Sequence, residues 1–127
     1  MAGETVLIVD DNPMNMELAT DLLEAAGYVV RQAATAEDAI AAAKTAPPHL
    51  ILMDLSLPGM DGLAATRVLK ADPATRSIPV IALTAHAMKG DEDKARAAGC
   101  EGYITKPIDT RALPKTVARF MASGGNA

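Results

Sequence analysis

The chain has 127 residues, the length of one domain that can bury a sizeable core. Half of the residues are hydrophobic but only 2% are aromatic, so the core has to consist of aliphatic side chains and methionine. The net charge of −4, with no basic stripe, argues against nucleic-acid binding.

Targeting and redox signals are absent from the sequence. The single cysteine, Cys100, excludes an internal disulfide and a thiolate metal cluster. Apolar runs stay far short of membrane-spanning length, and the first residues lack the basic start of a signal peptide. We therefore expect a cytoplasmic protein that has no membrane contact.

Short apolar runs alternate with segments of helical character along the chain. The predicted strands cover residues 5–9, 28–32, 50–54, 78–83 and 102–104. The predicted helices cover residues 13–26, 36–45, 63–70, a segment ending at 98, and 109–121. Asn12-Pro13 is typical of a helix start, and Pro47-Pro48 prevents the second helix from continuing. The residues expected on the inner face of the first helix are Leu18, Leu22, Ala25 and Ala26.

Strict alternation of five strands and five helices predicts an α/β fold with a parallel sheet and helices on both faces. At this length the expected form is a doubly wound, flavodoxin-like (βα)5 sheet with strand order 2-1-3-4-5. Residues 4–122 form the predicted domain, and residues 123–127 form a frayed tail.

Carboxylates follow two strands that this order places side by side. Asp10 and Asp11 follow the first strand, and Asp54 ends the third. Asp54 alone fits a loop carboxylate that caps the next helix equally well. Three clustered carboxylates, however, repel one another unless a cation compensates, and Mg²⁺ prefers such oxygen ligands. The pattern suits a site at which a phosphoryl group is transferred to an aspartate.

A hydroxyl and an ammonium group follow the other two strands of the same edge. Thr84 follows the apolar run of the fourth strand, and Lys106 follows the fifth strand. Taken singly, Thr84 fits a helix N-cap and Lys106 fits a solvated surface charge. Their consistent placement at strand ends favours a shared role in stabilising phosphoryl charge.

Four segments of the sequence resemble a known protein family. They are residues 6–12, 52–62, 79–85 and 102–107, with Leu52-Met53-Asp54 and Thr105-Lys106-Pro107 among them. The sequence resembles the receiver domain of two-component response regulators over the whole chain except its last few residues. Residues 85–92 and 98–100 are similar to single-domain regulators of the DivK type, and also to receivers attached to hybrid kinases.

The resemblance implies a role for each strand-end residue. Asp54 accepts a phosphoryl group from a histidine kinase or a histidine phosphotransfer protein. Asp10, Asp11 and Asp54, with the main-chain carbonyl of Ser56, hold Mg²⁺, and Mn²⁺ is a possible substitute. Thr84 bonds a phosphoryl oxygen.

The resemblance also implies residues for a conformational switch and for docking of the phosphodonor. Lys106 pairs with Asp54 and precedes Pro107 through a cis peptide bond. Tyr103 turns inward with Thr84 as an aromatic switch, although plain core packing also explains Tyr103. The expected docking surface for the phosphodonor consists of Met14, Asn15, Leu18, Pro107 and Ile108.

The sequence thus predicts a single-domain response regulator that signals through a downstream protein contact. It is a phosphoacceptor with self-catalysed transfer and autodephosphorylation, and not an enzyme in the ordinary sense. One alternative is a receiver domain cut from a hybrid kinase or a larger regulator. Another is a Mg²⁺-dependent phosphohydrolase of the haloacid dehalogenase type, against which Ser56 stands where a second acid is expected. A flavin-binding module of the same fold is disfavoured by Asp10 and Asp11.

Overall fold

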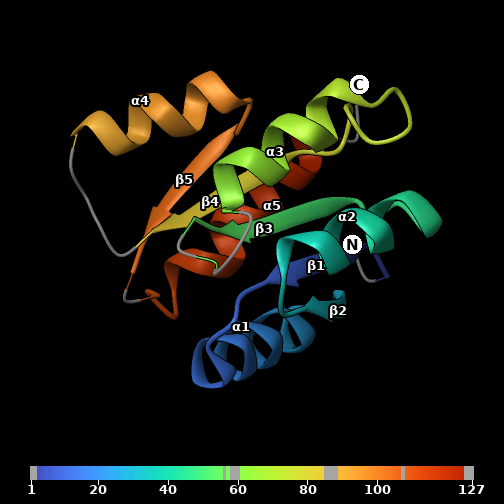
Figure 1. Ribbon diagram of the computed structural model, residues 1–127. Coiled ribbons are helices and arrows are strands. Elements are labelled where there is room, and N and C mark those ends of the chain that lie inside the picture. The colour runs from blue at the N-terminus through green and yellow to red at the C-terminus, as the bar shows by residue number, and fades with distance from the viewer. Residues whose placement is uncertain (1–2, 56, 58–60, 85–88, 107, 125–127) are drawn as a thin grey trace.

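The computed structural model describes residues 3–55, 57, 61–84, 89–106 and 108–124, with the backbone alone for 89–91 and 122–124. Five strands and five helices alternate along the chain (Figure 1). The strands are β1 (Thr5–Val9), β2 (Val29–Ala33), β3 (Leu50–Asp54), β4 (Val80–Thr84) and β5 (Gly102–Thr105). The helices are α1 (Pro13–Ala25), α2 (Ala36–Thr45), α3 (Gly62–Ala71), α4 (Lys89–Ala98) and α5 (Ala112–Gly124).

All strands are parallel, and their order is β2-β1-β3-β4-β5, which confirms the predicted fold. Every residue of β3 and β4 is buried, because these strands lie inside the sheet and both of their faces are covered. Among the described residues, no helix is long and apolar enough to cross a membrane.

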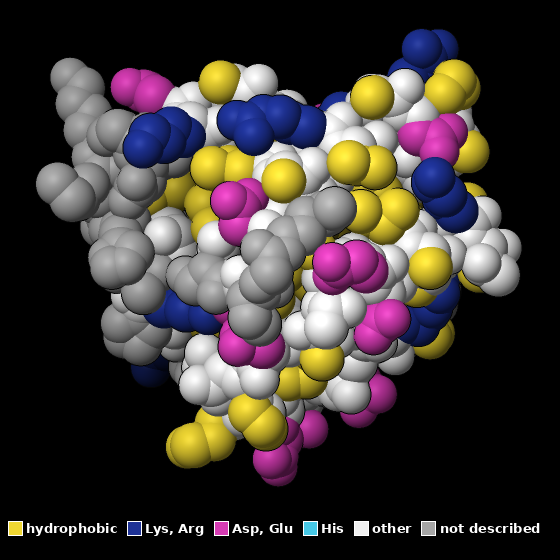
Figure 2. All heavy atoms as spheres, viewed as in Figure 1, with side chains coloured by type: hydrophobic (Ala, Val, Ile, Leu, Met, Phe, Trp, Pro, Cys, Tyr) yellow, Lys and Arg dark blue, Asp and Glu magenta, His cyan; other side chains and the backbone are white. Residues whose placement is uncertain are grey.

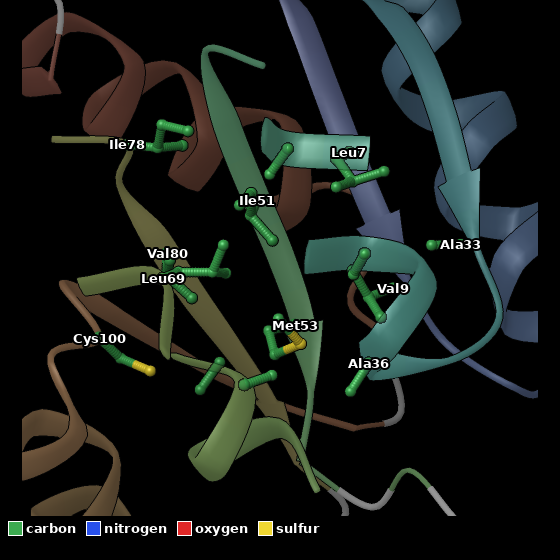
Figure 3. Close-up of a cluster of buried hydrophobic side chains, with 14 of the residues drawn as sticks. Leu7, Val9, Ala33, Ala36, Ile51, Met53, Leu69, Ile78, Val80 and Cys100 are labelled. Carbon is green, nitrogen blue, oxygen red and sulfur yellow. The ribbon is translucent and has the colours of Figure 1, made fainter. Parts of the chain in front are cut away.

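Two hydrophobic clusters cover the two faces of the sheet. One lies under α2, α3 and α4, where Leu7, Ile51 and Met53 point from the strands towards the helices (Figure 3). The other lies under α1 and α5 and includes Leu52 and Leu83. Alternate residues of β1, β3 and β4 therefore supply opposite clusters, as the period of a strand requires.

The predicted inner face of α1 is wrong for three of its four residues. The buried residues are Met16, Ala19 and Leu23, whereas Leu18 is 37% exposed and Ala25 is exposed. Leu22 is partly buried against the same core, but Ala26 is exposed. Both sets have helical spacing, so the choice between them depends on how α1 is rotated on the sheet.

Several boundaries also differ from the prediction. β2 lies one residue later than expected, and β4 begins at Val80, after Pro79. α5 begins at Ala112, because the Asp109 Oδ1 atom accepts the N–H groups of Arg111 and Ala112 and forms a turn before the helix. α5 then continues to Gly124, which the prediction placed in the tail.

Candidate functional site

Three carboxylates meet at the carboxyl edge of the sheet. The β1–β3 register pairs Val9 with Met53, so the residues that follow, Asp10 and Asp54, are neighbours. Asp10 is 3% and Asp54 1% exposed, whereas Asp11 is open to solvent. One oxygen from each of the three carboxylates lies within 4.8 Å of the others. The structure thus brings together the acidic residues that the sequence singled out.

Lys106 reaches into this cluster from the neighbouring strand end. Its backbone N–H donates to the Thr84 carbonyl at 2.7 Å, which continues the pairing of β4 with β5. Its ammonium Nζ lies 3.1 Å from Asp54 Oδ2 and 3.2 Å from Asp10 Oδ2. The Lys106 side chain is only 15% exposed. One buried ammonium therefore bridges the two buried carboxylates.

The charges of this cluster do not balance. Burial raises the pKa of Asp10, and the negative charge of Asp54 adds to the rise, although the Asn12 N–H and Lys106 act in the opposite direction. Burial alone would lower the pKa of Lys106, but the charges of Asp54 and Asp10 outweigh it and raise that pKa. Three carboxylates face one ammonium, so the site favours a further cation.

The donor set fits a hard divalent cation. Carboxylate oxygens are the ligands that Mg²⁺ and similar ions prefer, usually beside several waters. Asp11 is exposed, so an ion held by this cluster would keep positions open to water and to an incoming oxygen. The Ser56 carbonyl, the fourth predicted ligand, lies outside the described residues.

Two residues that shape the site were missed by the sequence analysis. The Asn12 N–H donates to Asp10 Oδ1 at 2.9 Å, and the Asn12 side chain accepts from the N–H groups of Met14 and Asn15 at the start of α1. A Cβ atom on Gly62 would lie 2.3 Å from the Asp54 carbonyl oxygen. Glycine is required there, because α3 begins directly against the end of β3. The dipeptide Asp61-Gly62 is typical of a turn, but nothing in the sequence indicated the contact with Asp54.

Thr84 and Tyr103 occupy the neighbouring strands. Thr84 is 3% exposed and lies one residue beyond Leu83, the register partner of Asp54. Tyr103 is partly buried and packs against the cluster under α2, α3 and α4. This packing fits a core residue as well as a switch, so the switch role stays a prediction. The predicted Lys106–Pro107 cis bond lies outside the described residues.

The predicted docking surface is partly corrected. Met14 is 80% exposed, Leu18 is 37% exposed and Asn15 is half-buried at the start of α1. Ile108, in contrast, is buried in the α1–α5 core, so it does not lie on that surface. It follows β5 directly and fills the space beneath α5, which its position in the sequence did not reveal. Pro107 lies outside the described residues.

Comparisons with known proteins agree with this geometry. The model of the response regulator receiver domain family matches residues 6–118. The polar-differentiation response regulator DivK of Brucella ovis is 46% identical over 118 residues, which cover 93% of this chain and 96% of DivK.

Solved structures are also similar to this chain in sequence and in fold. The receiver domain of the sensor histidine kinase PA1611 from Pseudomonas aeruginosa PAO1 has a magnesium ion coordinated in its active-site cleft. It is 36% identical with a TM-score of 0.88, and the match covers 95% of this chain and 99% of that one. The chemotaxis protein CheY4 of Vibrio cholerae is 29% identical with a TM-score of 0.88, over 93% and 98% of the two chains.

Proposed function

Because the chain belongs to the response regulator receiver domain family, we propose that Asp54 accepts a phosphoryl group from a histidine kinase or a histidine phosphotransfer protein. The observation that carries this proposal is the environment of Asp54. Its carboxylate is buried at the end of β3, contacts the Lys106 ammonium at 3.1 Å and adjoins two further carboxylates. Beside a purely structural aspartate, two further carboxylates would only add charge repulsion.

In this reaction an Asp54 oxygen attacks the phosphorus atom while the bond between phosphorus and the donor histidine nitrogen breaks. The histidine nitrogen keeps the bonding electrons. The Lys106 ammonium already contacts Asp54, so it lies close enough to pair with a transferred phosphoryl oxygen. The Thr84 hydroxyl, on the adjacent strand end, donates to another phosphoryl oxygen.

The proposed metal is Mg²⁺, with Mn²⁺ as a substitute. Asp10, Asp11 and Asp54 would hold it, with the main-chain carbonyl of Ser56 as a further proposed ligand. When bound, the ion would neutralise negative charge on the phosphoryl oxygens. The three carboxylates orient it, and the buried position of Asp10 and Asp54 limits access of bulk water.

Two further roles complete the proposal. Phosphorylation shifts an existing equilibrium in which Thr84 and Tyr103 move together. Met14, Asn15, Leu18 and Pro107 dock the phosphodonor beside the site, and a downstream protein reads the result. We place this activity in the cytoplasm, where a kinase and a protein target are both accessible.

The protein then acts as a phosphoacceptor that supports its own phosphorylation and dephosphorylation, without turning over an external substrate. A second candidate is a receiver domain within a larger signalling protein, which the similarity to the receiver of a sensor histidine kinase favours. The chemistry at Asp54 is the same in both cases.

Intact mass spectrometry tests the chemistry. Incubation with Mg²⁺ and acetyl phosphate should add one labile phosphoryl group, and both Asp54→Asn and a metal chelator should abolish it. One equivalent that accumulates on the chain supports a phosphoacceptor, whereas rapid, continued release of phosphate without accumulation of the adduct indicates the phosphohydrolase alternative. An adduct that persists in Asp54→Asn contradicts the assignment of Asp54.

A further inference from the structure

The face of the molecule formed by α1 and α5 carries two stripes of opposite charge. The acidic stripe on α1 consists of Glu17, Asp21 and Glu24, all of them exposed. Residues 1–30 contain no lysine or arginine, so nothing nearby in the sequence offsets it. Figure 2 shows acidic and hydrophobic side chains over the lower edge of the molecule, where α1 lies.

The basic stripe begins directly before α5 and runs along it. It consists of Arg111, Lys115 and Arg119, which recur every four residues and are all exposed. The buried residues of α5, among them Leu113 and Val117, lie on the other side of the helix. Arg119 also lies over the Phe120 ring, 4.8 Å from its centroid, which limits the freedom of its guanidinium group.

The two stripes have matching dimensions. At 1.5 Å per residue, the acidic stripe spans roughly 10.5 Å, and the part of α5 up to Arg119 spans roughly 10.5 Å as well, with Arg111 just before it. Both helices follow strands of one parallel sheet and pack on the same face, so they run in the same direction. Within the described residues, no ion pair joins one stripe to the other. The charges are therefore available to a second molecule.

We propose that a second copy of this chain docks on the α1–α5 face and that the acidic stripe of each copy contacts the basic stripe of the other. A two-fold axis parallel to the helices produces this arrangement. It places α1 of one protomer against α5 of its partner, with the helices parallel. The same contact then occurs twice, as an isologous interface requires.

An exposed apolar site lies beside the acidic stripe. Met14 is 80% and Leu18 37% exposed, and with Glu17 and Asp21 they line a shallow hollow of about 280 Å³. An unbranched Met side chain adapts to an irregular partner surface. Apolar anchors with charged residues around them are the usual composition of a specific interface. The hollow provides the apolar part that the charged stripes lack.

Self-association would have a regulatory consequence, which rests on the proposed function. Met14 and Leu18 also belong to the proposed docking surface for the phosphodonor. A dimer covers them, whereas the Asp54 pocket, at the edge of the sheet, stays open to a small phosphodonor. Dimerisation would thus reduce transfer from a protein donor and leave phosphorylation by acetyl phosphate unchanged.

Analytical ultracentrifugation of the whole chain tests the proposal directly. At 50 mM NaCl, sedimentation should show a monomer–dimer equilibrium between 10 µM and 1 mM protein, concentrations chosen for a weak, charge-dominated interface. Raising NaCl to 500 mM should weaken association at least roughly tenfold, because salt screens exposed charges. A monomer at every concentration and salt level, or a dimer that salt does not weaken, overturns the proposal.

Charge reversal locates the interface. Glu17→Lys/Asp21→Lys and Lys115→Glu/Arg119→Glu should each be monomeric alone, whereas an equimolar mixture should form a heterodimer. Glu37→Lys/Asp38→Lys makes the same change in net charge as the first variant, on exposed residues of α2 on the other face, and should leave the dimer intact. Restoration by mixing separates lost contacts from lost folding. Failure to restore, or loss in the α2 control, overturns the assigned interface.

Acetyl phosphate distinguishes this proposal from the proposed function. A variant that is monomeric but still gains the phosphoryl group supports both. A wild-type chain that dimerises yet never gains the group contradicts only the function, and one that gains the group but never dimerises contradicts only this inference.

Discussion

The two ends of the sheet each contain a partly buried lysine that contacts acidic or carbonyl oxygens, but only one of them is balanced in charge. At the amino end, Lys70 Nζ donates to the Ile78 carbonyl at 2.6 Å, the Arg76 carbonyl at 3.1 Å and Glu101 Oε2 at 2.9 Å. The other Glu101 oxygen accepts the Val80 N–H at 2.9 Å. One cation and one anion thus connect the end of α3 to the starts of β4 and β5.

At the carboxyl end, Lys106 contacts two carboxylates, and a third lies close by. The Lys106 contacts, at 3.1 and 3.2 Å, are longer on average than the Lys70 contacts, at 2.6 to 3.1 Å, and the charge around Lys106 is negative. This difference in net charge distinguishes a structural contact, at Lys70, from a binding site, at Lys106. A balanced pair lowers the energy of the folded chain by itself, whereas an unbalanced cluster reaches its lowest energy only when a cation is bound.

Removing Lys106 should have the largest effect on the chemistry. Lys106→Met leaves no ammonium group at Asp54, so phosphorylation by acetyl phosphate should slow by roughly 10²-fold, the usual cost of losing one group that stabilises developing charge. Initial rates of adduct formation, measured by intact mass in saturating Mg²⁺, check this. Lys70→Met is the matched control, and its rate should stay within about threefold of wild type. Equal loss in both variants would break the comparison between the two ends.

The same two variants should rank in the opposite order for stability. Lys70→Met removes three hydrogen bonds of a charged donor and leaves Glu101 without its cation, so the free energy of unfolding should fall by about 2 kcal/mol. In saturating Mg²⁺, Lys106→Met should cost less, because the bound ion still offsets the charges of Asp10 and Asp54, whereas nothing replaces the Lys70 ammonium at Glu101. Urea denaturation measures both values.

An exposed ion pair provides the reference for this measurement. Lys44 lies 3.3 Å from Asp72, and its side chain is 49% exposed. Lys44→Met should change the free energy of unfolding by less than about 0.5 kcal/mol, as is usual for solvated pairs. A loss as large as that of Lys70→Met would mean that the hydrogen bonds to the carbonyl groups add nothing at the amino end.

The sequence predicts the carboxyl end of the sheet much better than the amino end. Asp10, Asp54 and Thr84 each follow a continuous apolar run, and parallel strands align such ends. Lys70 and Glu101 are 31 residues apart, in a helix and a turn, and no local pattern connects them. Their contact exists only after α3 has packed beside β4.

The rotation of α1 and the position of Ile108 were unpredictable for a related reason. Helix α1 has two apolar stripes with helical spacing, and tertiary packing selects the one through Met16 and Leu23. The stripe through Leu18 is left outside, which is why α1 offers an apolar surface beside its acidic residues. Ile108 follows a strand, as several site residues do, but it is buried under α5. Spacing identifies candidate faces, and only packing decides which one is buried.

Replacing Asp10 should give a small but the most diagnostic change in stability. The pKa of Asp10 is raised chiefly by burial, so the folded protein holds this proton more tightly than the unfolded chain does. Stability therefore falls as pH rises from the ordinary value of 3.8 through the raised pKa, and ionised Asp10 opposes folding at neutral pH. Asp10→Asn removes that cost and keeps an oxygen for the Asn12 N–H, so it should stabilise the metal-free protein at pH 7 by roughly 1 kcal/mol.

The pH and metal dependence of this gain decide whether its cause is charge imbalance. The gain should shrink towards pH 3, where Asp10 is protonated in both states, and should disappear in saturating Mg²⁺, which binds wild type more tightly. Glu101→Gln is the matched control from the balanced end, and it should destabilise the protein at pH 5 and 7, with or without Mg²⁺, because Lys70 loses its anion. Urea curves at pH 3, 5 and 7, with and without Mg²⁺, measure all of these values. If the metal-free Asp10→Asn variant is less stable than wild type at pH 7, the contact with Lys106 outweighs the cost of burying ionised Asp10 beside Asp54. The two ends of the sheet would then not differ in charge balance as proposed.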